Sequence, residues 1–166
     1  CKKCVTLKKC VFNDRVNEFL EVAENFDGYV FGTPVHWAAA GGAITSFMDR
    51  VFYAGMNSGS DVFYLKPAAA VVSARRAGTT ATFDQLNKYF TLVQMPIISS
   101  QYWNMVHGAH AEDVQYDLEG LQTMRTLARN MAYFLKCREL AQKNGIPLPE
   151  REKITFTNFI HNCDHV

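Results

Sequence analysis

The loop of residues 33–40 carries the residue types most able to hold a flat ligand. It follows a short apolar run, and its small residues let the backbone approach a ligand closely. Pro34 fixes the turn, and His36 and Trp37 can flank a planar ring. In an open α/β sheet, a loop between a strand and the next helix is where ligands bind. The alternative interpretation is an ordinary connection with a surface aromatic and a neutral surface histidine.

A second loop, residues 73–80, follows another apolar run and has the same small-residue character. It adds two cations, Arg75 and Arg76. A cation beside a ligand can stabilise negative charge that develops during a reaction. The alternative is that both arginines are solvated loop charges, and we expect only one of them to face a ligand.

The cysteines suggest a different chemistry at the amino-terminal end. Cys1, Cys4 and Cys10 form a C-x2-C-x5-C pattern, whereas Cys137 and Cys163 lie far away in the sequence. Three thiolates within ten residues are candidate iron–sulfur or zinc ligands, but both groups usually require four protein ligands. Five cysteines make a poor disulfide framework, so we expect a reducing, cytoplasmic setting.

Composition and missing motifs exclude several classes of protein. The 166 residues are 48% hydrophobic and 20% charged, with a net charge of +1, which is typical of one soluble domain and gives no reason to expect nucleic-acid or membrane binding. No dinucleotide-binding glycine pattern, P-loop or serine-hydrolase elbow is present. No pair of carboxylates stands out for acid–base catalysis.

Hydrophobic periodicity predicts how these loops are positioned. Short apolar runs alternate with segments whose apolar residues recur at helical spacing, which favours right-handed βαβ units and a parallel sheet. The predicted strands are residues 29–31, 68–73 and 95–98, and the predicted helices are residues 14–26, 41–52, 80–91 and 113–144, with an aromatic loop at 99–110 and a surface tail after residue 150.

Four segments together resemble the flavodoxin-like NADPH-dependent FMN reductase family. Residues 32–37, Gly-Thr-Pro-Val-His-Trp, and residues 46–50, Ser-Phe-Met-Asp-Arg, are similar to that family's Gly-Ser/Thr-Pro-Val-Tyr loop and the helix that follows it. Residues 73–80 and 100–108 match one subgroup, related to iron–sulfur flavoproteins. The resemblance implies a single flavodoxin-like domain over residues 1–166, a doubly wound parallel sheet in a three-layer α/β/α arrangement.

The resemblance also implies a cofactor site for FMN. The first loop would contact the ring and ribityl chain, the second would border the pyrimidine side of the ring, and an aromatic segment would close over it in this subunit or a neighbour. The implied cofactor-binding residues are Thr33, Pro34, Val35, His36, Trp37, Ser73, Arg75, Arg76, Gly78, Thr79, Trp103 and His107. His36 stands where the family often has Tyr.

The function implied by the resemblance is an oxidoreductase in which NAD(P)H reduces FMN. Electrons would then pass to a quinone, a second flavin, another small acceptor or a redox protein, with no side chain acting as an indispensable acid or base. A homodimer or homotetramer is expected. The alternatives are an iron–sulfur flavoprotein carrying a cluster at Cys1, Cys4 and Cys10, and a non-catalytic module that has lost FMN.

One part of the family pattern has no counterpart in these residues. A flavodoxin-like sheet places its first strand at the centre, and the loop after that strand binds the FMN phosphate at a helix amino terminus. Residues 1–13 lack such a loop. We therefore expect the natural polypeptide to carry an amino-terminal segment, or the sheet to be completed by another chain.

Overall fold

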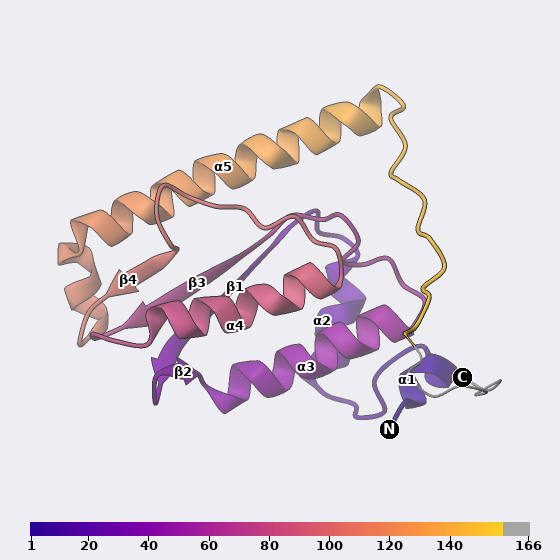
Figure 1. Cartoon of the computed structure of the whole chain (residues 1–166), viewed down its shortest axis with the longest axis horizontal. Coiled ribbons are helices and arrows are strands. Elements are labelled where there is room, and N and C mark those ends of the chain that lie inside the picture. Colours follow the sequence, from indigo (N-terminus) through magenta and orange to yellow (C-terminus); the bar gives the residue numbers. More distant parts are fainter. Residues whose placement is uncertain (158–166) are drawn as a thin grey trace.

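A computed structural model describes residues 1–157 (Figure 1). The chain after the last helix is exposed as far as residue 157, in agreement with the predicted surface tail, and the remainder of that tail, with Cys163, lies outside the described residues. No helix in the described part combines the length and apolarity that a membrane span requires.

Six α-helices or helical turns and four strands alternate along the described chain. In order they are α1 (Lys3–Leu7), α2 (Arg15–Ala23), β1 (Tyr29–His36), β2 (Ala39–Ala40), α3 (Gly42–Asn57), β3 (Ala68–Ala74), α4 (Thr79–Leu92), β4 (Met105–His107), the 3-10 helix η1 (Ala111–Tyr116) and α5 (Leu118–Lys143). Gly145, at φ +72°, follows α5 in the left-handed conformation that ends many helices.

The sheet has the strand order β2-β1-β3-β4. β1, β3 and β4 are parallel, whereas β2 forms a two-residue antiparallel hairpin with the end of β1. α3 connects β1 to β3 and α4 connects β3 to β4, as parallel neighbours require. The mainly parallel α/β sheet predicted from the sequence is confirmed.

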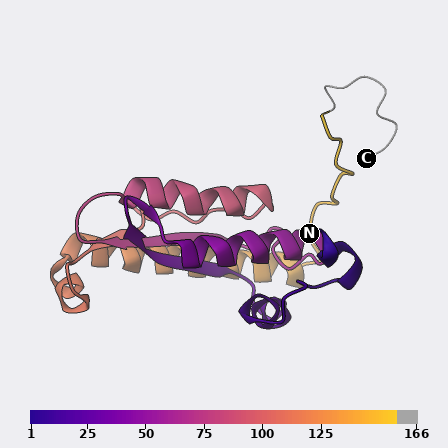
Figure 2. The ribbon, with the colours of Figure 1, turned by 90° about the horizontal axis from the view of Figure 1, so that it is seen from below.

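Successive side chains of β3 lie on opposite faces of the sheet. Ala68, Ala70 and Val72 join a large cluster with side chains of α3 and α4, whereas Ala69 packs with Leu127 of α5. Figure 1 shows α5 along one side of the sheet and α4 in front of the strands, and Figure 2 shows α4 set off from them on one face. The order of layers is therefore helix, sheet, helix.

Aromatic rings fill the face beneath α3 and α4. The Phe31 ring lies 5.4 Å from that of Phe52 and 5.5 Å from that of Phe90, measured between centroids. Phe52 stacks on Phe63 at 4.6 Å. These four rings hold β1 in place from one side.

The predicted third strand, residues 95–98, is wrong in its position. Only Ile97 bridges to β3, opposite Ala68, and the next paired residue is Met105, opposite Val72. Between these two pairs β3 advances by four residues, whereas the neighbouring segment advances by eight. The extra residues of that segment form a loop around residues 99–103. The run is apolar because it packs in the core (Met95 and Ile98 are buried), not because it forms a continuous strand.

The predicted boundary of the first strand is also wrong. Residues 33–36, predicted as loop, belong to β1, which continues in register with β3 as far as Pro34 and then pairs with β2. Proline is tolerated there because it stands on the edge of the sheet. The short helix α1 and the hairpin strand β2 were not expected from the sequence.

Candidate functional site

The carboxyl ends of three parallel strands meet along one edge of the sheet. Pro34 of β1 lies opposite Ser73 of β3, and Ser73 lies opposite Val106 of β4. The next pair, Ala74 and His107, extends this row. The register thus brings both predicted ligand loops and His107 to one edge, the place where open parallel sheets bind ligands.

The two loops are in direct contact. Gly78 adopts φ +92°, and a Cβ atom added to it would lie 2.7 Å from Ala38 Cα and 2.8 Å from Val35 Cγ1. Real Cβ atoms essentially never make contacts this short, so the close approach of the two loops requires glycine at residue 78. A hydrogen bond also links the β1–β2 hairpin to α4, because the Ala40 N–H donates to Gln85 Oε1 at 3.2 Å.

Trp37 stands at the tip of the β1–β2 hairpin and is fully exposed. Its φ is +47° and that of Ala38 is +63°, so two consecutive non-glycine residues occupy the left-handed region that a tight hairpin turn demands. This conformation is costly for side chains larger than glycine and is concentrated at functional sites. The indole is therefore exposed to solvent at the carboxyl edge of the sheet.

The second loop presents two cations beside a helix amino terminus. Arg75 and Arg76 are exposed, and neither forms an ion pair with any described residue. α4 begins directly afterwards at buried Thr79, with Gly78 as its N-cap and no side chain capping it. Uncapped N–H groups and guanidinium groups together suit a ligand that carries partial negative charge.

Trp103 and His107 lie together, but not with the first loop. They line a cavity of about 140 Å³ between β4 and the start of α5, together with Tyr102, whose ring centroid is 5.1 Å from that of Trp103, and Asp117. Asp117 accepts from the His107 N–H at 2.7 Å and caps α5 through Gly120 N–H at 2.9 Å. No residue of the 33–40 loop lines this cavity.

Asp117 and Gln85 were not among the predicted site residues. Asp117 could have been predicted as an N-cap, because it stands directly before a segment with helical spacing of apolar residues and aspartate is favoured at that position. Tyr102 lay within the predicted aromatic loop. Nothing in the sequence pointed to Gln85, because its contact with Ala40 joins residues 45 positions apart.

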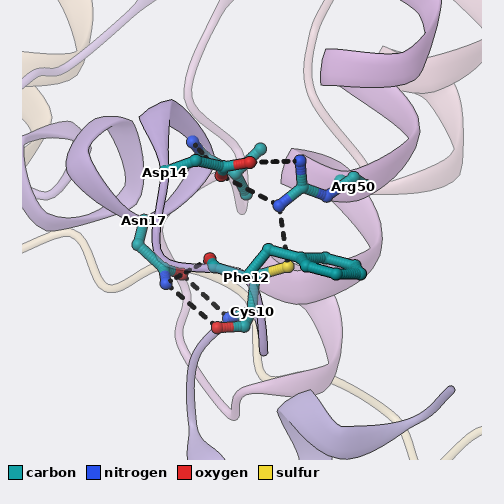
Figure 3. Close-up of polar contacts among 6 residues, drawn as sticks. Cys10, Phe12, Asp14, Asn17 and Arg50 are labelled. Carbon is teal, nitrogen blue, oxygen red and sulfur yellow. Dashed lines mark hydrogen bonds and ion pairs between the residues drawn. The ribbon is translucent and has the colours of Figure 1, made fainter.

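Cys10 belongs to a polar cluster between the segment before α2 and α3 (Figure 3). Arg50 of α3 donates to Cys10 Sγ at 3.1 Å and to both carboxylate oxygens of Asp14, at 2.7 and 2.9 Å. The guanidinium also lies 5.0 Å from the centroid of the Phe12 ring. Asn17 fixes the same segment by binding the Cys10 N–H and the carbonyls of Cys10 and Phe12.

The arrangement of Cys1, Cys4 and Cys10 does not fit a metal cluster. Cys4 is buried within α1, Cys1 is exposed, and Cys10 contacts a cation. Across residues 1–157, no three Cys, His, Asp or Glu side chains gather closely enough to hold a metal ion. The three cysteines predicted as iron–sulfur ligands are thus not brought together.

The carboxyl-edge geometry agrees with the comparison to known families. The model of the family described as NADPH-dependent FMN reductase matches residues 2–110. The chain belongs to this family. It is therefore a flavin-dependent oxidoreductase by family, with FMN as the family's cofactor.

The individual proteins that match have low sequence identity to this chain. An iron-sulfur flavoprotein of Methanocaldococcus jannaschii, MJ1083, is 27% identical over 143 residues, which is 82% of this chain and 72% of that protein. A WrbA-like flavodoxin of Agrobacterium tumefaciens matches with a TM-score of 0.52 and 13% identity, covering 71% of this chain and 78% of the other. An NADPH-quinone reductase of P. pentosaceus matches at a TM-score of 0.49 and 18% identity, with 74% of each chain covered. The WrbA-like match shows a flavodoxin-like fold.

Proposed function

We propose that the chain holds the FMN ring at the carboxyl edge of its sheet, between residues 33–37 and 73–79, and that NAD(P)H reduces it. One observation carries the proposal: the two loops touch at Gly78 and Ala38, directly beyond the row formed by Pro34, Ser73 and Val106. The donor set there fits a flavin ring, because it combines backbone groups, arginine cations and an exposed indole.

Each part of the site has a role that follows from its position. Trp37 covers one face of the ring and limits its contact with water. Arg75 or Arg76, with no ion pair in the described chain, stabilises negative charge on the pyrimidine side of the reduced ring. Peptide groups of residues 34–36 and 76–79 orient the ring edge, and Thr33, whose hydroxyl donates to Pro34 O at 3.0 Å, steadies the strand end.

When bound, FMN would supply the chemistry, namely hydride transfer from NAD(P)H followed by electron transfer to an acceptor. The protein orients the two reactants and supplies electrostatic stabilisation. The acceptor is a small molecule or a redox protein. The cavity lined by Tyr102, Trp103 and His107 lies at β4, next to the strand that precedes the second loop. The expectations of a homo-oligomer and of a cytoplasmic location stay predictions.

A binding titration tests the proposal. FMN fluorescence should be quenched on addition of the protein, and the complex should oxidise NADPH when a quinone is present. Arg75→Ala or Arg76→Ala should weaken FMN binding by about tenfold, the effect of losing one charge-assisted hydrogen bond. Arg129→Ala, at an exposed arginine of α5, is the matched control and should leave binding unchanged. A protein that stays colourless after incubation with FMN would falsify the proposal.

An iron–sulfur flavoprotein is the second candidate, because the C-x2-C-x5-C spacing and the Methanocaldococcus relative both favour it. The structure leaves the three cysteines apart, so we expect iron and sulfide close to zero in protein purified without oxygen. The absorption spectrum should then show only the two flavin bands. Stoichiometric iron, lost in Cys10→Ser, would establish the second candidate instead.

A further inference from the structure

The cavity between β4 and the start of α5 is lined by both aromatic rings and carboxylates. Tyr102 and Trp103 supply the rings, and Asp117 and Glu119 supply the carboxylates. No lysine or arginine of residues 1–157 lines it. The surrounding sequence has the same bias, because residues 89–124 carry four carboxylates but neither lysine nor arginine. The cavity therefore differs in charge from the loop that carries the two arginines.

The size of this cavity fits one aromatic ring. Its volume is about 140 Å³, and an apolar cavity of roughly 150 Å³ holds one benzene molecule. Tyr102 and Trp103 are each about half exposed, so both rings have surface available to a ligand. Their planes are tilted by 56° rather than stacked face to face.

The loop that carries the aromatic pair is fastened to α5. Thr126 Oγ1 donates to Gln101 Oε1 at 2.7 Å, and Asn130 Nδ2 donates to Ser99 O at 2.8 Å. Both donors belong to α5, and both acceptors precede the aromatic pair in the loop. The cavity is thus formed before any ligand enters it, and a preformed site loses less conformational entropy on binding.

The carboxylates of the cavity have no cationic partner from lysine or arginine within residues 1–157. The Asp117 side chain is only 18% exposed, and its hydrogen bonds come from the peptide N–H groups of His107 and Gly120. The imidazole Nδ1 of His107 lies 3.8 Å from Asp117 Oδ2, which is too far for a hydrogen bond. Glu119 is exposed and forms no ion pair in this part of the chain. A carboxylate partly shielded from water attracts a cation more strongly than one at the open surface.

We propose that this cavity binds a small planar aromatic cation, with its ring against Tyr102 and Trp103 and its charge toward Asp117 and Glu119. Tryptophan and tyrosine rings attract cations that approach within about 6 Å of the ring centre. The two carboxylates disfavour phosphates and other anions at the same place. In this proposal the aromatic pair contacts a ligand other than FMN.

The position of the cavity gives such a ligand a place at the carboxyl edge of the sheet. His107, which lines the cavity, pairs with Ala74 at the start of the second loop. An electron acceptor that carries an aromatic cation would therefore reach the edge at which FMN is proposed to bind. This consequence rests on the proposed function, whereas binding of the cation itself does not.

Titration of the full chain with N-methylpyridinium, followed by nuclear magnetic resonance, tests the inference. The chain has two tryptophans, and Trp37→Phe identifies which indole N–H signal belongs to Trp103. N-methylpyridinium should shift the Trp103 signal saturably and leave that of Trp37 in place, with or without added FMN. Pyridine at pH 8 has the same ring without the charge and should bind about tenfold more weakly. Equal affinity for the two compounds, or no saturable shift at Trp103, would overturn the inference.

Three variants test whether the carboxylates of the cavity hold the cation. Glu119→Gln should weaken N-methylpyridinium binding about threefold, as expected for an exposed charge. Asp117→Asn should weaken it about tenfold, because this charge is better shielded from water, and urea unfolding checks that α5 keeps its cap. Glu112→Gln, at an exposed residue of η1 that does not line the cavity, is the control and should bind normally. If Glu112→Gln weakens binding as much as Glu119→Gln, the general charge of this region holds the cation, contrary to the proposal.

Discussion

At the scale of single residues, the contact between the two loops of the candidate site depends on the absence of a side chain at Gly78. Gly78→Ala adds a methyl group 2.7 Å from Ala38 Cα, and backbone atoms must move to accept it. It also forces alanine to adopt φ +92°. The conformational part costs about 1 kcal/mol, and the overlap adds about 1–3 kcal/mol. We expect the free energy of unfolding, measured in urea, to fall by the sum, and FMN binding to weaken as the loops separate.

Gly145→Ala provides the matched control for that variant. Gly145 has φ +72°, but a Cβ atom there would meet nothing within 4 Å. It therefore reports the conformational cost alone, and its effect on FMN binding should be nil. If the two substitutions destabilise equally, the contact between the loops does not exist as described.

The Tyr29 hydroxyl makes stability depend on pH in alkaline solution. It is buried, donates to the carbonyls of Ala23 and Val62 at 2.5 and 3.0 Å, and its pKa is raised to about 12, first by burial and then by Asp27 and Glu24. A phenol whose pKa is raised on folding contributes stability that is full below pH 10, the ordinary pKa, and is lost as pH rises through 12.

We therefore expect Tyr29→Phe to cost about 1 kcal/mol at pH 8 and less at pH 11.5, where the wild-type hydroxyl has begun to ionise in the unfolded chain. Urea unfolding at the two pH values measures this convergence. Tyr89 shares the raised pKa of about 12, through burial and its hydrogen bond to Asp49, so part of the alkaline loss persists in the variant. Tyr116→Phe, at an exposed tyrosine, should show no convergence.

At the scale of elements, the ion pair between Asp14 and Arg50 joins the start of α2 to α3. Hydrogen bonds from Arg50 hold the pKa of Asp14 below its usual value, and the same carboxylate caps α2 by accepting from Val16 N–H at 3.1 Å. A carboxyl whose pKa is lowered on folding contributes stability above its ordinary pKa of about 4, and that stability disappears as pH falls further.

Asp14→Asn should therefore flatten the acid side of the stability curve below about pH 4, as followed by circular dichroism during acid titration. Glu18→Gln removes an exposed ion pair within one helix and is the control, because such pairs contribute little. A variant at Asp14 that unfolds along the wild-type acid curve would show that the link between the helices is not formed.

Elements with a complete local signal could be predicted from the sequence. α3 and α4 show helical spacing, and β3 is apolar throughout because both of its faces are covered. β4 and β2 could not be predicted. β4 has only three paired residues after a looped-out segment, and β2 exists only because Trp37 and Ala38 accept positive φ. The contacts of Gly78 with Ala38 and of Gln85 with Ala40 could not be predicted either, because they depend on strand register rather than on the local sequence pattern.

At the scale of the whole molecule, the helices on the two faces of the sheet are held by hydrophobic clusters of unequal size. The α3 and α4 face holds the large aromatic cluster, whereas the α5 face rests on a small one of Ala69, Ile98 and Leu127. α5 buries Gly120, Thr123 and Leu127, all in its first half, and its exposed residues include Tyr133 and Phe134. The layer of β4 and α5 should therefore open before the rest.

Leu127→Ala tests this order of unfolding. Removing a buried leucine side chain costs about 2–5 kcal/mol, and here the loss falls on the contact between α5 and the sheet. Amides of α5 and β4 should exchange faster in the variant, while those of α4 and of Phe31 keep their wild-type rates. Because Gly78 and Ala38 belong to the better secured layer, FMN binding through the two loops should persist as the cavity around Trp103 and His107 loosens. Equal acceleration in α4 and α5 would mean that both faces unfold as one cooperative unit, and FMN binding would then be lost together with the β4 layer.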